Sequence, residues 1–181
     1  MITKNPLILA SASPRRAELL TQIGVRFTVQ PADIDEQLIE GESPEAYVLR
    51  LAATKARTVA ERSDAAFVLG ADTVVVVDDE ILGKPSDDDD AVAMLTKLAG
   101  REHEVFTGVA LAMVPPGEDV KSFVVSTKVN FRPLTCGETT AYVASGEPKD
   151  KAGAYGIQGL GGMLVESIEG SYSNVVGLPL A

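Results

Sequence analysis

The stretch FVLGADTVVVV, residues 67–77, carries one charged residue, Asp72, among β-branched and other apolar residues. A run of this composition predicts a buried strand. The acidic residues 78–80 that follow predict a tight turn, after which Ile81-Leu82 would form a short return strand. The sequence therefore predicts a buried strand that turns back on itself.

Helical and extended segments alternate on both sides of this strand. Before it we expect a short strand at 7–10, a helix from Ser13-Pro14 to about Ile23, a strand at 26–30, and a long helix from Ser43-Pro44 to about Arg62. After it we expect a helix capped by Ser86, strands at 104–114 and 121–131 around the turn 115–117, a short helix at 138–145, and strands at 163–168 and 173–176. This alternation, with one long hairpin, predicts an α/β fold with a mixed twisted sheet flanked by helices.

The composition is that of an acidic globular protein. The 181 residues have a formal net charge of −10, and 45% of them are hydrophobic. At about 150 residues per domain, this length predicts a single domain over residues 1–181, and the composition excludes a disordered chain. The charge argues against nucleic-acid binding, because affinity for a duplex comes mainly from Lys and Arg. The net negative charge does not exclude binding of a small phosphorylated ligand, since a site for such a ligand needs only local positive charge.

The sequence gives no sign of export or of membrane insertion. Cys136 is the only cysteine, which fits a reducing compartment. The apolar run 7–10 is too short for a signal peptide, and Arg15 and Arg16 follow it closely. No stretch approaches the roughly 20 apolar residues of a membrane helix. We therefore expect a cytoplasmic protein with no membrane partner.

Several common catalytic arrangements are excluded by counting. His103 is the only histidine, and its polar neighbours predict a surface side chain. One Cys and one His cannot form a zinc site, and the chain lacks a Walker A motif. Carboxylates, lysines, arginines and backbone groups remain, and they are typical of phosphate chemistry assisted by a hard divalent cation.

Residues 11–16, SASPRR, form the first candidate site. A strand ends there and a helix begins, so free N–H groups and the helix dipole favour an anion. The Ser11 and Ser13 hydroxyls and the Arg15 and Arg16 guanidinium groups add donors for a phosphate. The alternative is a capped surface helix that carries two arginines by chance.

Lys55 and Asp72 are charged residues in apolar surroundings. Lys55 shares a helix face with three apolar residues, Val48, Ala52 and Val59, so its ammonium must either extend to solvent or meet an anion. Asp72 interrupts a strand that is otherwise apolar, so its carboxylate should be protonated, paired with a cation or bound to a metal. A structural salt bridge is the plain alternative for Asp72.

Three further segments carry candidate residues. Pairing across the turn 78–80 would place Lys84 opposite residues 72–74, and Glu36 lies in the acidic loop 33–37. The segment 149–159 combines three glycines and two lysines with Gln158, whose amide could read a base edge, although a flexible loop is the alternative. The run of aspartates 87–90 falls in the first turn of a helix, which favours a solvated cap.

Taken together, these motifs resemble one family. SASPRR at 11–16, KAR at 55–57, GADT at 70–73, KP at 84–85 and KAGAYGIQG at 151–159 resemble the Maf (septum formation inhibitor) family of nucleoside triphosphate pyrophosphatases, in particular its subgroup acting on dTTP and UTP. The resemblance implies a fold related to the inosine-triphosphate pyrophosphatases, with a cleft between two lobes, and a homodimer. It also implies hydrolysis of a nucleoside triphosphate between its α and β phosphates with Mg²⁺ or Mn²⁺. Family members usually continue past residues 176–180 into a C-terminal helix, which we expect to be absent here.

The resemblance also implies a role for each matching residue. The catalytic residues would be Asp72, Glu36, Lys55 and Lys84. Asp72 would accept a proton, Glu36 and Asp72 would hold the metal, and Lys55 and Lys84 would bind the triphosphate. The substrate-binding residues would be Ser11, Ser13, Arg15, Arg16, Thr73 and Gln158, and among these Arg15, Thr73 and Gln158 match positions that distinguish the subgroup. The family is linked to nucleotide house-cleaning, including removal of modified nucleotides, and to division arrest. A nucleotide-binding regulator of division without turnover is the alternative function.

Overall fold

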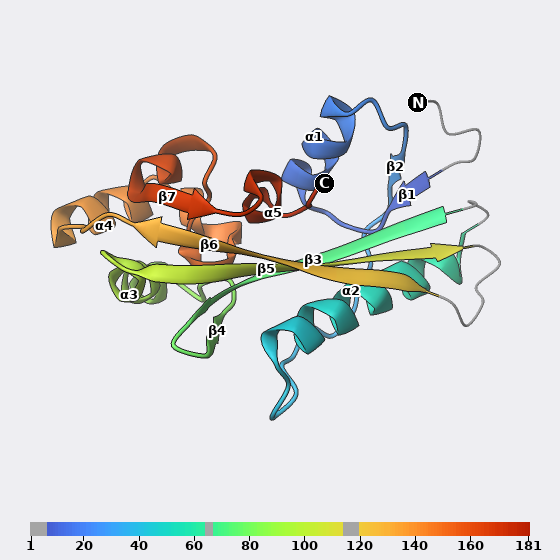
Figure 1. Cartoon of the computed structure of the whole chain (residues 1–181), viewed down its shortest axis with the longest axis horizontal. Coiled ribbons are helices and arrows are strands. Elements are labelled where there is room, and N and C mark those ends of the chain that lie inside the picture. Colours follow the sequence, from blue (N-terminus) through green and yellow to red (C-terminus); the bar gives the residue numbers. More distant parts are fainter. Residues whose placement is uncertain (1–6, 64–66, 114–119) are drawn as a thin grey trace. The chain divides into compact units, whose positions relative to one another are not determined.

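The computed structural model describes residues 7–63, 67–113 and 120–181 (Figure 1). The chain divides into two compact units. Unit 1 contains Met1–Asp72, Thr107–Val125 and Gly177–Leu180, and unit 2 contains Thr73–Phe106, Ser126–Val176 and Ala181. Two units agree with the two predicted lobes, whereas a cleft between them stays a prediction.

The sheet is mixed, as predicted. Its hydrogen-bonded neighbours follow the order β2-β1-β3-β5-β6-β7, and β4 pairs with β3. Strand β1 is parallel to β2 and β3, whereas β4 is antiparallel to β3 and β7 is antiparallel to β6. The strands are β1 (Leu7–Leu9), β2 (Thr28–Val29), β3 (Phe67–Val77), β4 (Glu80–Leu82), β5 (Glu102–Met113), β6 (Lys121–Phe131) and β7 (Val165–Glu169). The predicted turn 115–117 lies outside the described residues.

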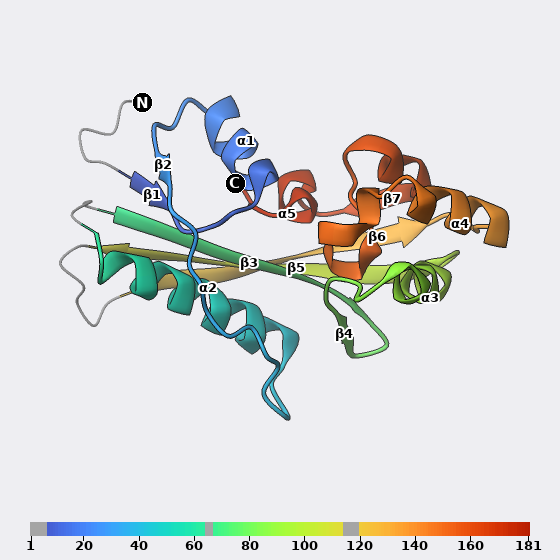
Figure 2. The same ribbon diagram turned by 180° about the vertical axis from the view of Figure 1, so that it is seen from behind.

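In unit 1, helix α2 (Pro44–Ala60) packs closely on the sheet (Figure 2). The Ser43 hydroxyl accepts a hydrogen bond from the Ala46 N–H, so the predicted cap is present. A Cβ atom at Gly70 would lie 2.2 Å from the Ala52 carbonyl oxygen, and one at Gly108 would lie 2.4 Å from that of Val48. These glycines therefore allow the backbone of α2 to approach β3 and β5. The other helix of this unit is α1 (Pro14–Gln22).

Unit 2 has its own hydrophobic core, which includes Leu95, Val105, Phe131, Tyr142 and Tyr155. Its helices are α3 (Asp88–Leu98), α4 (Cys136–Ala144) and α5 (Tyr172–Val176), with short 3₁₀ helices at Glu147–Asp150, Ala152–Ala154 and Gly159–Leu164. The three 3₁₀ helices cover the glycine-rich region, and the strand predicted at 163–168 begins two residues later, as β7.

Two predicted features of unit 2 are wrong in detail. Residues 173–176 form helix α5 and not a strand, because the Ser171 hydroxyl accepts a hydrogen bond from the Asn174 N–H at 3.3 Å. Helix α3 is capped by Asp87 and not by Ser86: the Asp87 carboxylate accepts from the Asp90 N–H at 2.8 Å. Since the helix dipole favours negative charge at this end, the capping role expected for the aspartate run is confirmed.

The prediction for His103 is also wrong. Its side chain is buried, with 2% exposed, and packs edge-on against Phe131 and Tyr155 at ring distances of 4.9 and 5.4 Å. Its Nε2 lies 2.8 Å from the Tyr155 hydroxyl, and burial lowers the pKa of His103 to about 4. The alternation of β5 turns this residue inward despite its polar neighbours.

Within the described ranges, we find no helix with the length and apolar character needed to span a bilayer.

Candidate active site

Lys55, Asp72 and Glu36 form a charged cluster in unit 1. The Lys55 Nζ lies 2.6 Å from Asp72 Oδ1 and 2.6 Å from Glu36 Oε1. The side chains of Lys55 and Asp72 are 10% and 11% exposed, whereas that of Glu36 is 46% exposed. The lysine on the apolar helix face therefore meets anions and does not extend to solvent. The Asp72 carboxylate, for which the sequence left three outcomes open, is paired with a cation.

The loop that carries Glu36 is held by side chains of α2. The Tyr47 hydroxyl donates to the Glu36 carbonyl oxygen at 2.7 Å. Arg50 donates to the Gln37 carbonyl oxygen at 3.1 Å and forms two hydrogen bonds of 2.6 Å with the Glu42 carboxylate. The sequence did not identify Tyr47 or Arg50, because their partners include backbone groups of a loop whose path no local pattern fixes.

Tyr47 lies within the electrostatic influence of the cluster. Burial, together with the negative charges of Asp72 and Glu36, raises the pKa of its hydroxyl to about 12. The hydroxyl is therefore neutral near pH 7 and available as a hydrogen-bond donor. This chemistry suits a residue that holds the Glu36 backbone in place.

The start of α1 adds four of the predicted residues to unit 1. The Ser13 N–H donates to the Ser11 hydroxyl at 3.2 Å, and the Ser13 side chain makes no capping bond. Arg16 is 8% exposed and donates to the Ser11 hydroxyl at 2.9 Å and to the Gly177 carbonyl oxygen at 2.8 Å. Arg16 thus joins α1 to the last segment of the unit, while Arg15 is half-buried.

The charges of Arg16 and the carboxylate cluster act on one another. Burial is the main cause that lowers the pKa of Arg16, while Asp72 and Glu36 raise it and Arg15 lowers it. The structure therefore brings the arginines of α1 into the same electrostatic environment as the Lys55 cluster. Seven of the predicted site residues belong to unit 1: Ser11, Ser13, Arg15, Arg16, Glu36, Lys55 and Asp72.

The other three predicted residues, Thr73, Lys84 and Gln158, belong to unit 2. In the β3–β4 pair, Val75 is opposite Leu82, where β4 ends, so the position of Lys84 opposite residues 72–74 stays a prediction. The Gly153 N–H donates to the Gly83 carbonyl oxygen at 3.0 Å, so the glycine-rich segment begins beside Lys84. Gln158, further along that segment, is half-buried at the start of a 3₁₀ helix.

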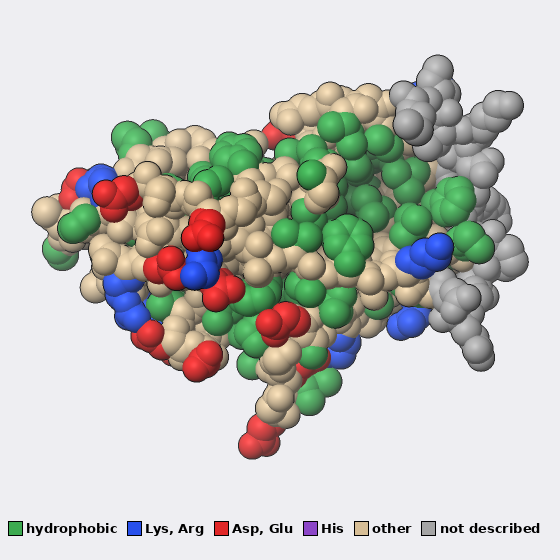
Figure 3. All heavy atoms as spheres, in the orientation of Figure 1, with side chains coloured by type: hydrophobic (Ala, Val, Ile, Leu, Met, Phe, Trp, Pro, Cys, Tyr) green, Lys and Arg blue, Asp and Glu red, His purple; other side chains and the backbone are tan. Residues whose placement is uncertain are grey.

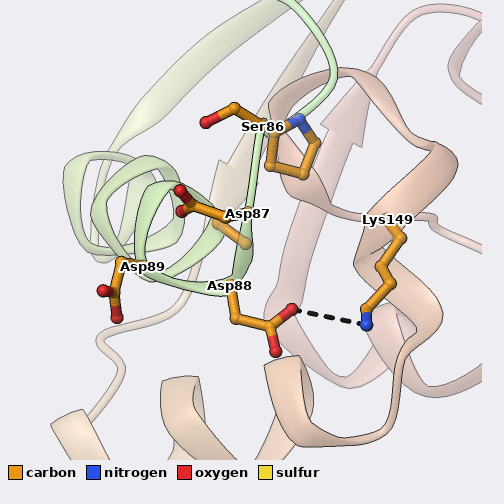
Figure 4. A pocket seen from close by; sticks show the side chains of 7 residues that line it. Ser86, Asp87, Asp88, Asp89 and Lys149 are labelled. Atoms are coloured by element: carbon orange, nitrogen blue, oxygen red, sulfur yellow. Dashed lines mark ion pairs between the residues drawn. The ribbon is translucent and has the colours of Figure 1, made fainter.

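A pocket of about 560 Å³ at the start of α3 is acidic and does not suit a triphosphate (Figure 4). Asp87, Asp88 and Asp89 line it, and the Lys149 Nζ lies 3.6 Å from the Asp88 carboxylate. Lys149 and Lys151 both pair with carboxylates of unit 2, since Lys151 lies 2.6 Å from Asp150.

The carboxylates of Glu36 and Asp72 are oxygen donors of the kind that a magnesium-type ion prefers. No group of three or more His, Cys, Asp or Glu side chains suited to a metal occurs in the part of the chain that the structure describes. However, Glu36 and Asp72 each place one oxygen 2.6 Å from the Lys55 ammonium nitrogen, so the two carboxylates lie close to one another. Mg²⁺ is commonly held by one or two carboxylates together with substrate phosphates and water.

The sequence of this chain is similar to one protein family and to several relatives that share one name. A family model described as Maf-like protein matches residues 6–181. A dTTP/UTP pyrophosphatase from Myxococcus xanthus is 60% identical over 174 residues, covering 96% of this chain and 87% of the relative. Relatives of the same name from Pseudoalteromonas atlantica and Geotalea uraniireducens are both 53% identical; they cover 96% and 99% of this chain, and 91% and 92% of their own lengths are matched.

Solved structures support the fold alone. A HAM1 protein from Coxiella burnetii, 18% identical, has a TM-score of 0.51 and covers 70% of this chain and 73% of its own. The Ham1 protein of Staphylococcus aureus is 14% identical and has a TM-score of 0.50. The match covers 70% of this chain and 71% of the Ham1 chain. These likenesses agree with the predicted α/β fold class. With a family model that matches nearly the whole chain and relatives of this similarity, the chain belongs to the Maf family.

Proposed function

We propose that this chain is a nucleoside triphosphate pyrophosphatase. It hydrolyses dTTP and UTP, and modified pyrimidine triphosphates, to the nucleoside monophosphate and pyrophosphate. The observation that carries this proposal is the Lys55 ammonium held between the carboxylates of Asp72 and Glu36, in a unit that also presents the Ser11–Arg16 helix start. The name shared by relatives at 53% to 60% identity supports the same substrates.

Different residues of unit 1 can contact different phosphate oxygens of the triphosphate. Arg15 and the helix start offer guanidinium and backbone N–H donors to phosphate oxygens. The Lys55 ammonium has three N–H donors, of which two are directed to Asp72 and Glu36. The third would bind a phosphate oxygen. A contact of this kind near 4 Å is worth on the order of 4 kcal/mol at an effective dielectric constant of about 20, before desolvation.

Asp72 would act as the proton acceptor. A water molecule attacks the α-phosphorus, the bond from that phosphorus to the oxygen bridging to the β-phosphate breaks, and pyrophosphate leaves. Lys55 binds Oδ1 of Asp72, so we assign the proton of the attacking water to Oδ2. Thr73, Lys84 and Gln158 keep the roles that the family resemblance predicts for them.

Glu36 and Asp72 would hold a divalent cation, Mg²⁺ or Mn²⁺. When bound, such an ion would neutralise phosphate charge and lower the pKa of a coordinated water. The proposal rests on the closeness of the two carboxylates, which share the Lys55 ammonium as a partner, and on the chemistry of oxygen donors.

We also propose a cytoplasmic homodimer. The single cysteine, Cys136, is exposed, which suits a reducing compartment. Met113 and Phe123 of unit 1 are 59% and 52% exposed, and Figure 3 shows further hydrophobic side chains at the surface. Sedimentation equilibrium tests the dimer: a mass of one chain at micromolar concentration would contradict it.

Product analysis tests the function. Incubation of the protein with UTP and Mg²⁺ should yield UMP and pyrophosphate in equal amounts. Release of UDP and phosphate would place the cleavage at a different bond and contradict the proposal. Tight binding of UTP without any product would instead favour a nucleotide-binding regulator.

A further inference from the structure

Two side chains of unit 2 that carry no predicted role, Glu147 and Tyr142, hold the backbone on both sides of Gln158. On one side, the Gly156 N–H donates to the Tyr142 hydroxyl oxygen at 3.3 Å. On the other side, the Leu160 and Gly161 N–H groups donate to the Glu147 carboxylate at 3.0 and 2.9 Å. The Tyr142 hydroxyl donates to the same carboxylate at 2.9 Å, which joins the two sides.

The glycines of this segment allow the backbone to close around the network. A Cβ atom at Gly161 would lie 2.3 Å from the Gly156 carbonyl oxygen and 2.6 Å from the Tyr142 hydroxyl. One at Gly159, whose φ is +70°, would lie 2.7 Å from a Glu147 oxygen. Residues 156 and 161 therefore meet at the base of a closed loop, and Gln158 lies within that loop.

The two side chains are in the protonation states that this network needs. Burial raises the pKa of Tyr142, which is 6% exposed, so its hydroxyl is a donor at neutral pH. Burial alone would raise the pKa of Glu147, but the hydrogen bonds from Gly161, Leu160 and Tyr142 outweigh it and lower this pKa. Glu147 is thus an ionised acceptor that receives several donors at once.

Fixing this loop matters because a glutamine amide is ambiguous. Rotation by 180° exchanges its donor NH₂ and its acceptor oxygen. In one orientation the amide matches the N3–H donor and the O4 acceptor of uracil or thymine. In the other it matches the N3 acceptor and N4 donor of cytosine. A fixed backbone does not choose between the two orientations by itself, but it holds the amide at one place relative to the base, so that the rest of the site can favour one orientation. An amide on a loose loop could follow either base.

We infer that Glu147, acting with Tyr142, is a positioning residue for Gln158 and sets the preference for uracil and thymine over cytosine. The inference rests on the proposed function, in which the Gln158 amide contacts the base. Neither Glu147 nor Tyr142 needs to touch the nucleotide, because both act through the backbone of residues 156–161.

The substitution Glu147→Gln tests the inference. It keeps the shape of the side chain but leaves one acceptor oxygen, so at least one loop N–H loses its partner. We expect the ratio of kcat/KM for UTP to that for CTP to fall roughly tenfold, the scale of one lost base contact, mainly through a higher KM for UTP. Glu166→Gln, at an exposed position of β7, is the matched control and should keep the wild-type ratio.

A double-variant cycle separates positioning from a general loss of stability. In a Gln158→Ala background, Glu147→Gln should not change the UTP to CTP ratio further, because the amide that it positions is gone. Tyr142→Phe removes the acceptor for Gly156 and should lower the ratio in the same direction, and it carries the test if Glu147→Gln fails to fold.

The outcomes distinguish this inference from the proposed function. If the wild-type protein releases no pyrophosphate from UTP, the proposed function fails. If it does so but shows no preference for UTP over CTP, or if the foldable variants keep the wild-type ratio, the positioning role is contradicted while the pyrophosphatase stands.

Discussion

Lys55 illustrates how one side chain can have both a structural and a chemical role. Its ammonium compensates the buried carboxylate of Asp72 and also contacts Glu36, so it stabilises the cluster before any nucleotide arrives. Taking one partner from a buried pair is costly because the remaining charge has lost its water and its counterion. The salt-bridge interpretation of Asp72 and the catalytic one are therefore compatible in this fold.

Lys55→Met should destabilise the protein in the absence of ligands. Methionine keeps the apolar stem but leaves the Asp72 carboxylate, which is 11% exposed, without its cation. We expect the free energy of unfolding, measured in urea at pH 7, to fall by about 3 kcal/mol. Lys121→Met, at an exposed position of β6, is the control and should change it little. An unchanged free energy of unfolding for Lys55→Met would mean that the ion pair between Lys55 and Asp72 does not stabilise the folded protein.

At the scale of elements, helix α2 both carries the lysine and fixes the loop opposite it. Its apolar face lies against the sheet at Gly70 and Gly108, which sets the depth of Lys55. Tyr47 and Arg50, on the same helix, bind the backbone of the loop 36–37. Helix α2 thus contacts both the loop that carries Glu36 and the strand that carries Asp72, and so helps to place these two carboxylates next to Lys55.

Tyr47→Phe should loosen Glu36 without disturbing the helix. The change removes the 2.7 Å hydrogen bond to the Glu36 carbonyl oxygen and nothing else of the side chain. One such bond contributes about 0.5–1.5 kcal/mol, so binding of Mn²⁺, measured by calorimetry, should weaken about two- to tenfold. Tyr172→Phe, on α5 and 49% exposed, should bind Mn²⁺ like the wild type. Equal affinity in the Tyr47 variant would exclude a role in placing Glu36.

The sequence predicts elements well where local chemistry decides them. Ser43-Pro44 opens α2 and the valine-rich run forms β3 within its predicted bounds, because capping and burial act within a few residues. The same reasoning gives a wrong prediction for residues 173–176, which form part of helix α5. Two valines there suggested a strand, but Ser171 caps a helical turn and the buried Asn174 amide donates to the Val105 carbonyl oxygen at 2.9 Å. That partner is distant in sequence.

For the whole molecule, the site residues that could be predicted are charged residues that occur at positions where the sequence pattern predicts burial. Lys55 and Asp72 stood out in apolar patterns, and the structure pairs them. Tyr47 and Glu147 could not be found, because their hydrogen bonds go to loop backbone whose course depends on the complete fold. His103 was misjudged for a related reason, since its burial depends on Phe131 and Tyr155 from other segments.

The burial of His103 predicts how the stability of the molecule depends on pH. Its pKa is lowered to about 4 in the folded state, whereas the unfolded chain titrates near 6.5. The neutral form is therefore favoured by folding, so its contribution is complete above pH 6.5 and is lost as the pH falls towards 4. Between pH 7 and 4.5 we expect a loss of about 2 kcal/mol from this group.

Urea unfolding at these two pH values measures the loss. In His103→Gln, which is neutral throughout, the free energy of unfolding should fall by about 2 kcal/mol less over the same interval than in the wild type. Identical pH dependence in both proteins would show that His103 does not titrate on unfolding in this range.

The most direct measurement on the central claim compares two aspartate variants with UTP and Mg²⁺. Asp72→Asn should still bind UTP, because Lys55 and the arginines of α1 remain to contact the phosphates, and it should release almost no UMP, because the amide cannot accept the proton of the attacking water. Asp79→Asn, at an exposed turn position, is the matched control and should turn over UTP normally. Near-normal turnover in Asp72→Asn would contradict the assignment of this carboxylate as the proton acceptor.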